Sequence, residues 1–374
     1  MISAPAEFLA ARHAALASLL GRGGLDALLV THRPNISYLT GFFGSAALLL
    51  VTREGLDLFS DARYAEVLRL LALEVPSLTV EAPPPGMGSA EQRLVARVGA
   101  LGLPRVGFEA QAISVRQHTD LVARLRHAAI TSELEAVDGF VESLRVIKDP
   151  WETATLREAG RRLSDVAKCI IPKVLKGFSE REVAAFIEGE LRQKGFERPA
   201  FDTIVAAGPH AALPHYRAGE RALQGGDLVV MDFGGMLRGY AVDITRTVVL
   251  GTPTRRQREC LEGVAASQQA AFAAAHVGAA PEDVDAAARQ ALADRGMGEA
   301  FVHGLGHGLG LEVHERPRLG PRREGMAEPP LAAGMVFTLE PGVYFPGWGG
   351  VRIEDDVLAA EAGPEWLTSG ADEV

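Results

Sequence analysis

The sequence has few cysteines and lacks the motifs that cysteines form in redox and zinc proteins. Cys169 and Cys260 are its only two cysteines, so neither a disulfide framework nor a CxxC motif is present. Both lie in stretches predicted to be helical, where a free cysteine packs as a small apolar residue. We therefore expect a protein of the reducing cytoplasm.

Long apolar runs and blocks of basic residues are also missing. Glu7, Arg12 and His13 interrupt the first apolar stretch, and no later stretch approaches the length of a membrane span. The net charge is -10, with 48 acidic against 38 basic residues, and no Lys/Arg cluster suggests a surface for phosphate groups. We expect a protein that is neither secreted nor membrane-bound, with no nucleic-acid and no membrane partner.

The composition that is present is that of a globular protein. The 374 residues are 47% hydrophobic and 23% charged, which is enough chain for about two domains. A helix start marks the boundary, because Asp149 is a natural N-cap, Pro150 suits the first helical position and Glu152 completes a capping box. We predict an N-terminal domain over residues 1–135 and a second domain over residues 145–374.

The N-terminal half alternates strand-like and helix-like segments. Apolar runs lie at residues 27–30, 46–51 and 56–59, and helix-like segments lie at 5–20, 62–73 and 115–127. This alternation predicts a small α/β domain.

In the C-terminal half, one order of elements occurs twice: helix, helix, loop, hairpin. The first copy has helices near 150–170 and 179–194, a loop around His215, and strands near 227–233 and 239–250. The second has helices near 254–276 and 281–295, a Gly-rich stretch at 303–315, and strands near 335–345 and 350–357. The copies share little sequence, but their common order indicates an internal duplication.

Each predicted hairpin carries a pair of carboxylates. A turn at residues 237–238 would set Asp232 directly opposite Asp243, with Cβ atoms roughly 5 Å apart. A turn at Gly347 would set Glu340 opposite Glu354 in the same way. Like charges directly opposite each other destabilise a sheet unless they are neutralised, and divalent cations would neutralise them.

An isolated Asp or Glu on a strand is usually solvated, but the residues before these carboxylates argue against that interpretation. Asp232 follows the apolar run 228–231 and Glu340 follows 335–339, and both runs are typical of strands buried on two faces. By the two-residue period of a strand, Arg352 projects from the same face as Glu354.

Histidine supplies a further ligand type in the segment 303–315. Glycines alternate with other residues between His303 and His307, and their small size allows close backbone approach. The segment is not a dinucleotide-binding GxGxxG motif, because position 309 is Leu. A single histidine in such a loop is more often structural, but four nearby carboxylates favour a role as a metal ligand.

These residues resemble the creatinase/aminopeptidase family of metallopeptidases, which has the pita-bread fold, and especially its prolidase and aminopeptidase P branch. The matching stretches are Pro214-His215-Tyr216, Asp232-Phe233-Gly234, Asp243-Ile244-Thr245-Arg246-Thr247, Gly306-His307-Gly308, Val313-His314-Glu315, Glu340-Pro341-Gly342 and Arg352-Ile353-Glu354-Asp355. A weaker likeness to the family's accessory domain lies in residues 35–42 and 61–64. The resemblance implies a mixed α/β fold, with a creatinase-like N-terminal domain and a pita-bread catalytic domain that has a pseudo-twofold repeat.

The resemblance also implies a two-metal site in each subunit. It makes Asp232 a ligand of one ion, His307 and Glu340 ligands of the other, and Asp243 and Glu354 bridges between the two. An oxygen-rich set with one imidazole suits hard to borderline cations, so manganese is our first choice, with cobalt or zinc as alternatives.

Roles in catalysis follow from the same resemblance. A water shared between the ions would attack the scissile carbonyl, with Glu340 as the proton acceptor. His215 and His314 would donate hydrogen bonds to the developing oxyanion, or would only support the ligands. Arg352 would bind a substrate carboxylate or orient the bridging carboxylates, and His303 would support the metal ligands.

The expected substrate is a proline-containing peptide, cut on the amino side of proline by a homodimer. The short N-terminal domain favours an Xaa-Pro dipeptidase (prolidase), with aminopeptidase P, which acts on longer peptides, as the alternative. The complete ligand set argues against a metal-free creatinase and a non-catalytic binding protein of the same fold. The N-terminal domain argues against a methionine aminopeptidase, and His215 and His314 argue against a structural calcium site.

Overall fold

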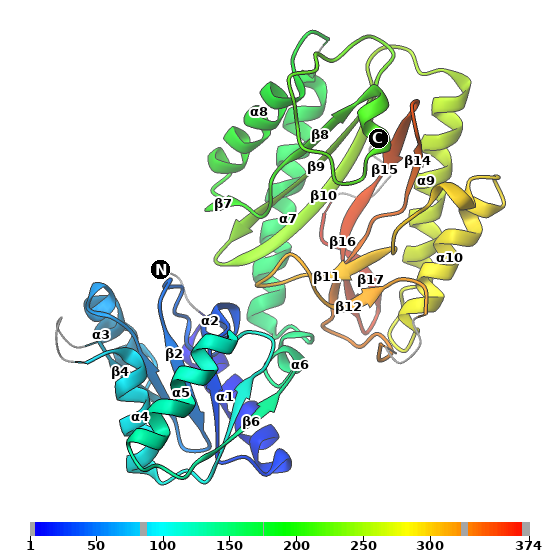
Figure 1. Ribbon diagram of the computed structural model, residues 1–374. Helices are drawn as coiled ribbons and strands as arrows, with labels where there is room; N and C mark the ends of the chain where they lie inside the picture. Colours follow the sequence, from blue (N-terminus) through cyan, green and yellow to red (C-terminus); the bar gives the residue numbers. More distant parts are fainter. Residues whose placement is uncertain (1–3, 83–87, 175, 323–327, 369–374) are drawn as a thin grey trace. The chain divides into compact units, whose positions relative to one another are not determined.

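The computed structural model describes residues 4–82, 88–174, 176–322 and 328–368 (Figure 1). The chain divides into two compact units, Met1–Arg145 and Val146–Val374, and both combine helices with a β-sheet. Among the helices described, none has the length and apolar character needed to cross a membrane.

The N-terminal unit is built on a six-stranded sheet with the order β4-β3-β2-β1-β5-β6. Its strands are β1 Ala27–Val30, β2 Leu48–Thr52, β3 Leu56–Phe59, β4 Leu78–Glu81, β5 Arg105–Glu109 and β6 Glu133–Val137. Its helices are α1 Ala6–Gly23, α2 Arg33–Thr40, η1 Ala62–Tyr64, α3 Ala65–Glu74, α4 Ala90–Leu101, α5 Val115–His127 and α6 Glu142–Arg145. Only β2 runs antiparallel to both of its neighbours, so the predicted α/β class of this unit is confirmed.

The C-terminal unit is built on a nine-stranded sheet with the order β12-β11-β13-β16-β10-β9-β7, with β8 paired to β9 and β17 paired to β16. Its strands are β7 Arg198–Pro199, β8 Ile204–Ala207, β9 Leu228–Leu237, β10 Tyr240–Val249, β11 Gly306–Gly308, β12 Glu315–Leu319, β13 Val336–Leu339, β16 Glu354–Ala360 and β17 Gly363–Trp366. A separate two-stranded sheet pairs β14 Gly342–Phe345 with β15 Gly349–Arg352.

Two helix pairs accompany this sheet, and they confirm the repeated order of elements. The pairs are α7 Pro150–Ile170 with α8 Glu180–Gln193, and α9 Arg255–Ala274 with α10 Pro281–Ala293 (Figure 1). Short 3-10 turns connect the elements at η2 Ile171–Lys173, η3 Gly208–Ala212 and η4 Gly298–Ala300. Helix α7 packs against β9 and β10 of the first hairpin, and α9 packs against β13, β14 and β15 of the second.

The predicted helix starts are present in the structure. Asp149 accepts hydrogen bonds from the backbone N–H groups of Trp151 and Glu152, both at 2.9 Å, and the Glu152 carboxylate accepts the Asp149 N–H at 3.0 Å. Ser179 and Glu182 form the same capping box at the start of α8. These caps satisfy N–H groups that the first helical turn leaves without partners.

The register of the first hairpin differs from the predicted one. Strands β9 and β10 turn at Arg238 and Gly239, one residue later than expected, and both residues have positive φ angles of 53° and 80°. Two-residue hairpin turns favour this conformation because it matches the twist of the strands. Asp232 therefore lies opposite Thr245, and Asp243 is a diagonal neighbour on the same face instead of the direct partner.

The second hairpin keeps the register that sets Glu340 opposite Glu354, but it is divided into two parts. The ladder pairs on either side of these carboxylates are Leu339 with Asp355 and Gly342 with Arg352. The division falls at Pro341, which has no N–H to donate to the ladder. Glu340 consequently lies just beyond β13, where its backbone N–H bonds to the carbonyl oxygen of Leu305 at 2.9 Å.

Candidate metal centre and active-site cleft

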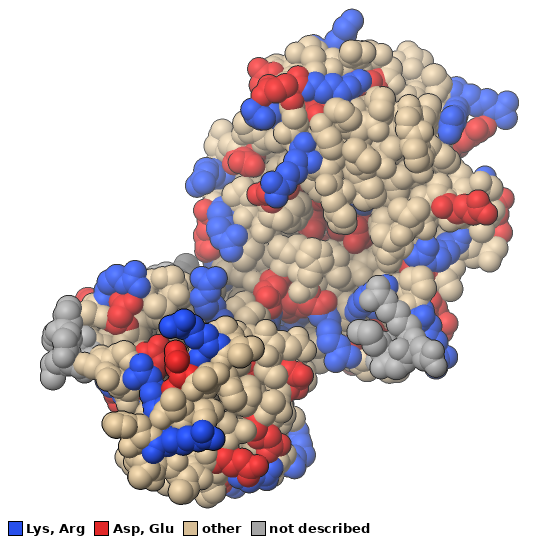
Figure 2. Space-filling model, in the orientation of Figure 1, with Lys and Arg blue, Asp and Glu red and all other residues tan. Residues whose placement is uncertain are grey.

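A cleft of about 750 Å³ opens in the C-terminal unit. Figure 2 shows acidic side chains at the bottom of a hollow in this unit. Every side chain that the sequence pointed to lines this cleft: His215, Asp232, Asp243, His303, His307, His314, Glu340, Arg352 and Glu354. The structure thus brings together residues that lie far apart in the sequence.

The five proposed metal ligands come from five strands or strand ends of the large sheet. Asp232 lies on β9, Asp243 on β10, His307 on β11 and Glu354 at the start of β16, while Glu340 directly follows β13. Single ligand atoms of Asp243, His307 and Glu354 all lie within 4.8 Å of one another. The Nε2 atom of His307 is 3.7 Å from an oxygen of Glu340, which adds a fourth donor to this group.

Two carboxylate oxygens at this site are buried without a hydrogen-bond partner among the described residues. Among the described residues, the Oδ1 atoms of Asp232 and Asp243 contact no donor, although the two residues are only 8% and 5% exposed. A buried acceptor without a donor costs about 1–3 kcal/mol, so such atoms need an explanation. Divalent cations would supply it, and oxygen donors with one imidazole fit hard to borderline ions.

The raised pKa values of the carboxylates also indicate a site for cations. Burial, followed by repulsion between neighbouring carboxylates, raises the pKa of Asp243 and of Glu340 well above their usual values. The same two causes raise the pKa of Glu354 to about 8. Bound cations would reverse this tendency, because a nearby positive charge favours the ionised carboxylates.

His307 is held in the form that binds metals. Burial first, and then the neighbouring His314, lower the pKa of His307 to about 4, so the ring is neutral at pH 7. Its Nδ1 atom lies 3.1 Å from the carbonyl oxygen of Gly308, which can only accept, so Nδ1 carries the proton. The Nε2 atom, which faces Glu340, is left with a free lone pair for a cation.

Arg352 is bonded to the carboxylates and to the residues that support them. Its Nη2 donates to Asp232 at 2.5 Å, and its Nη1 donates to the hydroxyl of Tyr344 at 2.9 Å. Its Nε donates to the Thr245 hydroxyl at 3.2 Å, which in turn donates to Glu354 at 2.6 Å. Of the two roles expected for Arg352, the geometry therefore favours orientation of the carboxylates.

Thr245 and Tyr344 were not predicted as site residues. The hydroxyl of Tyr344 donates to His303 Nε2 at 3.0 Å, because His303 Nδ1 lies 2.8 Å from the carbonyl oxygen of Gly304 and must be the protonated nitrogen. Alternation along a strand could have placed Thr245 on the face of Asp243, but no pattern indicates that Tyr344 reaches Arg352.

The remaining histidines lie on the cleft wall. The ring centroids of His307 and His314 are 4.2 Å apart, and burial, followed by the neighbouring His215, lowers the pKa of His314. His215 is exposed, and its ring makes no hydrogen bond with a described residue. Both rings are therefore available to a ligand in the cleft.

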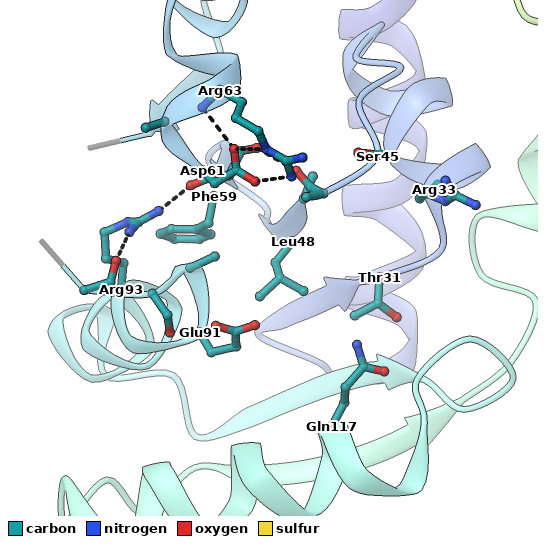
Figure 3. Close-up of a pocket in the computed structure, with 17 residues that line it drawn as sticks. Thr31, Arg33, Ser45, Leu48, Phe59, Asp61, Arg63, Glu91, Arg93 and Gln117 are labelled. Atoms are coloured by element: carbon teal, nitrogen blue, oxygen red, sulfur yellow. Dashed lines mark hydrogen bonds and ion pairs between the residues drawn. The ribbon is translucent and has the colours of Figure 1, made fainter. Parts of the chain in front are cut away.

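A second cleft of about 720 Å³ lies in the N-terminal unit (Figure 3). Two of its arginines bond to the protein itself: Arg63 donates to Asp61 at 2.9 and 2.6 Å, and Arg93 donates to the carbonyl oxygens of Gly88 and Ser60 at 2.7 and 2.6 Å. In the part of the chain that the structure describes, the only cluster of three metal-ligating side chains is that of the C-terminal unit.

Comparison with known families identifies the class of protein. Residues 154–361 match metallopeptidase family M24, and residues 12–147 match the creatinase/prolidase N-terminal domain. The chain belongs to metallopeptidase family M24, a family of divalent-metal peptidases. The predicted family, its pita-bread fold and the metal-dependent peptidase class are thereby confirmed.

Individual relatives cover almost the whole chain. An Xaa-Pro dipeptidase of Pyrococcus horikoshii is 35% identical over 351 residues, which are 93% of this chain and 94% of that protein. The structure of an Xaa-Pro dipeptidase from Bacillus anthracis has a TM-score of 0.89 at 32% identity and covers 97% of this chain and 98% of that one. The structure of an X-Pro aminopeptidase from Thermotoga maritima has a TM-score of 0.84 at 32% identity, with coverages of 92% and 96%.

Proposed function

We propose that this protein is an Xaa-Pro dipeptidase that hydrolyses the peptide bond on the amino side of proline. The observation that carries the proposal is the cluster of Asp243, His307 and Glu354 at the bottom of an open cleft, in a chain of family M24. Relatives that cover most of the chain and are described as Xaa-Pro dipeptidases support the choice of substrate. We also propose residues 145–374 as the catalytic domain and residues 1–135 as the accessory domain.

The donor set supports a site for two divalent cations. In this proposal Asp232, Asp243, His307, Glu340 and Glu354 would hold the ions. Manganese is the first choice, with cobalt or zinc as alternatives, because the set combines carboxylate oxygens with one imidazole. Bound cations of this kind supply Lewis acidity, which lowers the pKa of a coordinated water and polarises a carbonyl.

The roles of Glu340, His215 and His314 in this proposal come from the family resemblance, and that of Arg352 is supported by its hydrogen bonds. Glu340 accepts the proton of the attacking water. His215 and His314 donate hydrogen bonds to the carbonyl oxygen as negative charge develops on it, and to the departing proline nitrogen. Arg352 keeps Asp232 in place and, through the Thr245 hydroxyl, fixes Glu354.

Aminopeptidase P is the second candidate, because the structure of the X-Pro aminopeptidase from Thermotoga maritima is similar over nearly the whole chain. We favour the dipeptidase because Xaa-Pro dipeptidases recur among the similar proteins. We further propose a homodimer that acts in the cytoplasm, where the free thiols of Cys169 and Cys260 remain reduced.

Initial rates on two substrates test this proposal. The manganese-loaded protein is assayed on an Xaa-Pro dipeptide and on the same pair extended by two residues, each with a chelator control. Fast, chelator-sensitive cleavage of the dipeptide alone is the expected result. Preference for the longer peptide would identify an aminopeptidase P, and chelator-insensitive cleavage would exclude the metal-dependent mechanism.

A further inference from the structure

The segment that carries His215 has no regular secondary structure. It follows η3 Gly208–Ala212 and runs along the cleft through Pro214, His215 and Tyr216. Because no hydrogen bond to a described residue holds the exposed His215 ring, the position of the imidazole in the cleft depends strongly on the position of its backbone. Whatever holds this backbone therefore sets the position of the histidine.

The carboxylate of Glu180, at the first position of α8, holds this segment. It is 0% exposed and accepts four hydrogen bonds. Its Oε1 accepts the N–H of Ala207 at 3.0 Å and pairs with Nδ1 of His210 at 2.8 Å. Its Oε2 accepts the hydroxyl of Tyr216 at 3.0 Å and the N–H of Gly219 at 3.1 Å.

This arrangement requires a carboxylate. Each oxygen of Glu180 faces one backbone N–H, and a backbone N–H can only donate, so both oxygens must accept. The rings of His210 and Tyr216 also stack on each other, with centroids 4.5 Å apart. Burial, together with the hydrogen bond to Glu180, raises the pKa of Tyr216 and keeps its hydroxyl protonated as a donor.

The other side of the segment is tied to the proposed metal centre. The carbonyl oxygen of Pro214, directly before His215, accepts a hydrogen bond from Arg352 Nη1 at 3.3 Å. Arg352 in turn bonds to Asp232. The histidine thus stands between an anchor at Arg352 and the anchor at Glu180.

We propose that Glu180 is a positioning residue for His215, whose backbone it fixes relative to the cleft. Glu180 itself is absent from the lining of the cleft and bonds to none of the proposed metal ligands, so any effect it has on the cleft passes through the residues that it holds between 207 and 219. The inference rests on the proposed function, in which His215 stabilises the developing negative charge.

The first test is the kinetic effect of Glu180→Gln, which places an amide N–H₂ against one of the backbone N–H groups. We expect kcat on an Xaa-Pro dipeptide to fall about 100-fold, since a displacement of about 1 Å can cost that much. KM and manganese affinity should stay within about twofold, because the metal ligands are untouched. Glu180→Asp, which keeps both acceptor oxygens, should recover part of the loss.

Glu182→Gln is the matched control on the same helical turn. Glu182 is exposed and, among the residues that the structure describes, bonds only to Ser179, in a capping box that glutamine also completes. The kcat of the Glu182→Gln variant should equal that of the wild type. A loss in Glu182→Gln as large as that in Glu180→Gln would mean that the helix start matters, and would overturn the proposal.

A double-mutant cycle separates positioning from general damage. If Glu180 acts through His215, Glu180→Gln should cost less than about twofold in kcat when it is added to His215→Ala. Losses that multiply in the double mutant would show that the two residues act independently, and would overturn the proposal.

Hydrogen exchange of the metal-free protein gives a readout that needs no activity. Peptides covering residues 207–219 should exchange faster in Glu180→Gln than in the wild type, and unchanged exchange would refute the positioning role. A wild type that is inactive on Xaa-Pro peptides would refute the proposed function instead. If Glu180→Gln fails to fold, Tyr216→Phe removes one of the four bonds and should show faster exchange with a smaller fall in kcat; unchanged values would overturn the proposal.

Discussion

At the scale of single residues, the cleft contains carboxyl groups that the fold buries away from water. Asp243 and Glu354 are 5% and 2% exposed, and an oxygen of Asp243 has no hydrogen-bond donor among the described residues. Isolated carboxylates in such a setting hold their protons, whereas carboxylates beside cations release them. The stability of the protein should therefore depend on metal and on pH together.

The pH dependence of the metal-free protein has a definite sign. Glu354 has its pKa raised from 4.5 to about 8 by burial and by neighbouring carboxylates, so the folded state binds a proton that the unfolded state has released. We expect the free energy of unfolding of the chelated protein to fall as the pH rises from 4.5 to about 8. The free energy of unfolding of the manganese-loaded protein should fall less. Thermal unfolding at pH 5 and pH 8, with chelator and with manganese, measures the pH dependence of each form. Equal stability of the chelated protein at the two pH values would contradict this prediction.

Several site residues could be predicted because their chemistry shows in the sequence, and others could not. Carboxylates after buried apolar runs and histidines among glycines are unusual enough to stand out. Tyr344 and Thr245 are ordinary strand residues, and their roles depend on hydrogen bonds to Arg352 that only the folded structure creates.

At the scale of elements, the strands and helices follow from local patterns, whereas their ends and breaks depend on conformation. The runs at 27–30 and 56–59 form strands with the predicted bounds. Helix α2 was missed because Pro34 and Asn35 in its first turn look like breakers, although proline is favoured there. The first turn was misplaced because Arg238 adopts a positive φ, which its residue type does not reveal.

The glycines of β11 are needed because neighbouring backbone packs closely against them. A Cβ atom on Gly306 would lie 2.0 Å from the carbonyl oxygen of Thr338 on the neighbouring strand. Gly306→Ala should therefore destabilise the protein by about 1–3 kcal/mol in denaturant unfolding. Gly189→Ala, on α8 with nothing within 4 Å, is the control and should stabilise by about 0.5–1 kcal/mol. Unchanged stability of Gly306→Ala would show that the strands can move apart.

Helix α10 holds the loop that leads to His307. Asp285 is 2% exposed and accepts the N–H of Leu305 at 3.0 Å and two hydrogen bonds from Arg289, which also donates to the carbonyl oxygen of His303. Asp285→Asn should weaken manganese binding about 10-fold, as loss of a contact that supports a ligand does.

Calorimetric titration with manganese measures the effect of Asp285→Asn. The control is Asp283→Asn, an exposed position on the same helix that should leave the affinity unchanged. An affinity of Asp285→Asn equal to that of the wild type would show that the loop is held without this carboxylate.

At the scale of the whole molecule, two similar halves of the C-terminal unit supply the site. Each half contributes two carboxylates from one hairpin, and the hairpins meet where β10 pairs with β16. The sequence could predict this duplication from the order of elements, but not the division of the second hairpin at Pro341 or the edge pairings of β7 and β8. Those features depend on contacts between distant segments, which no local pattern encodes.

Manganese titration of the metal-free protein tests the central claim most directly, with Glu354→Gln measured beside it. Two ions per chain are expected for the wild type, with recovery of Xaa-Pro cleavage as the sites fill. Glu354→Gln should lose activity and bind manganese at least about 10-fold more weakly, because it removes one of the proposed carboxylate ligands. A wild type that binds no manganese, or a Glu354→Gln variant that binds and cleaves like the wild type, would contradict the assignment of the metal centre.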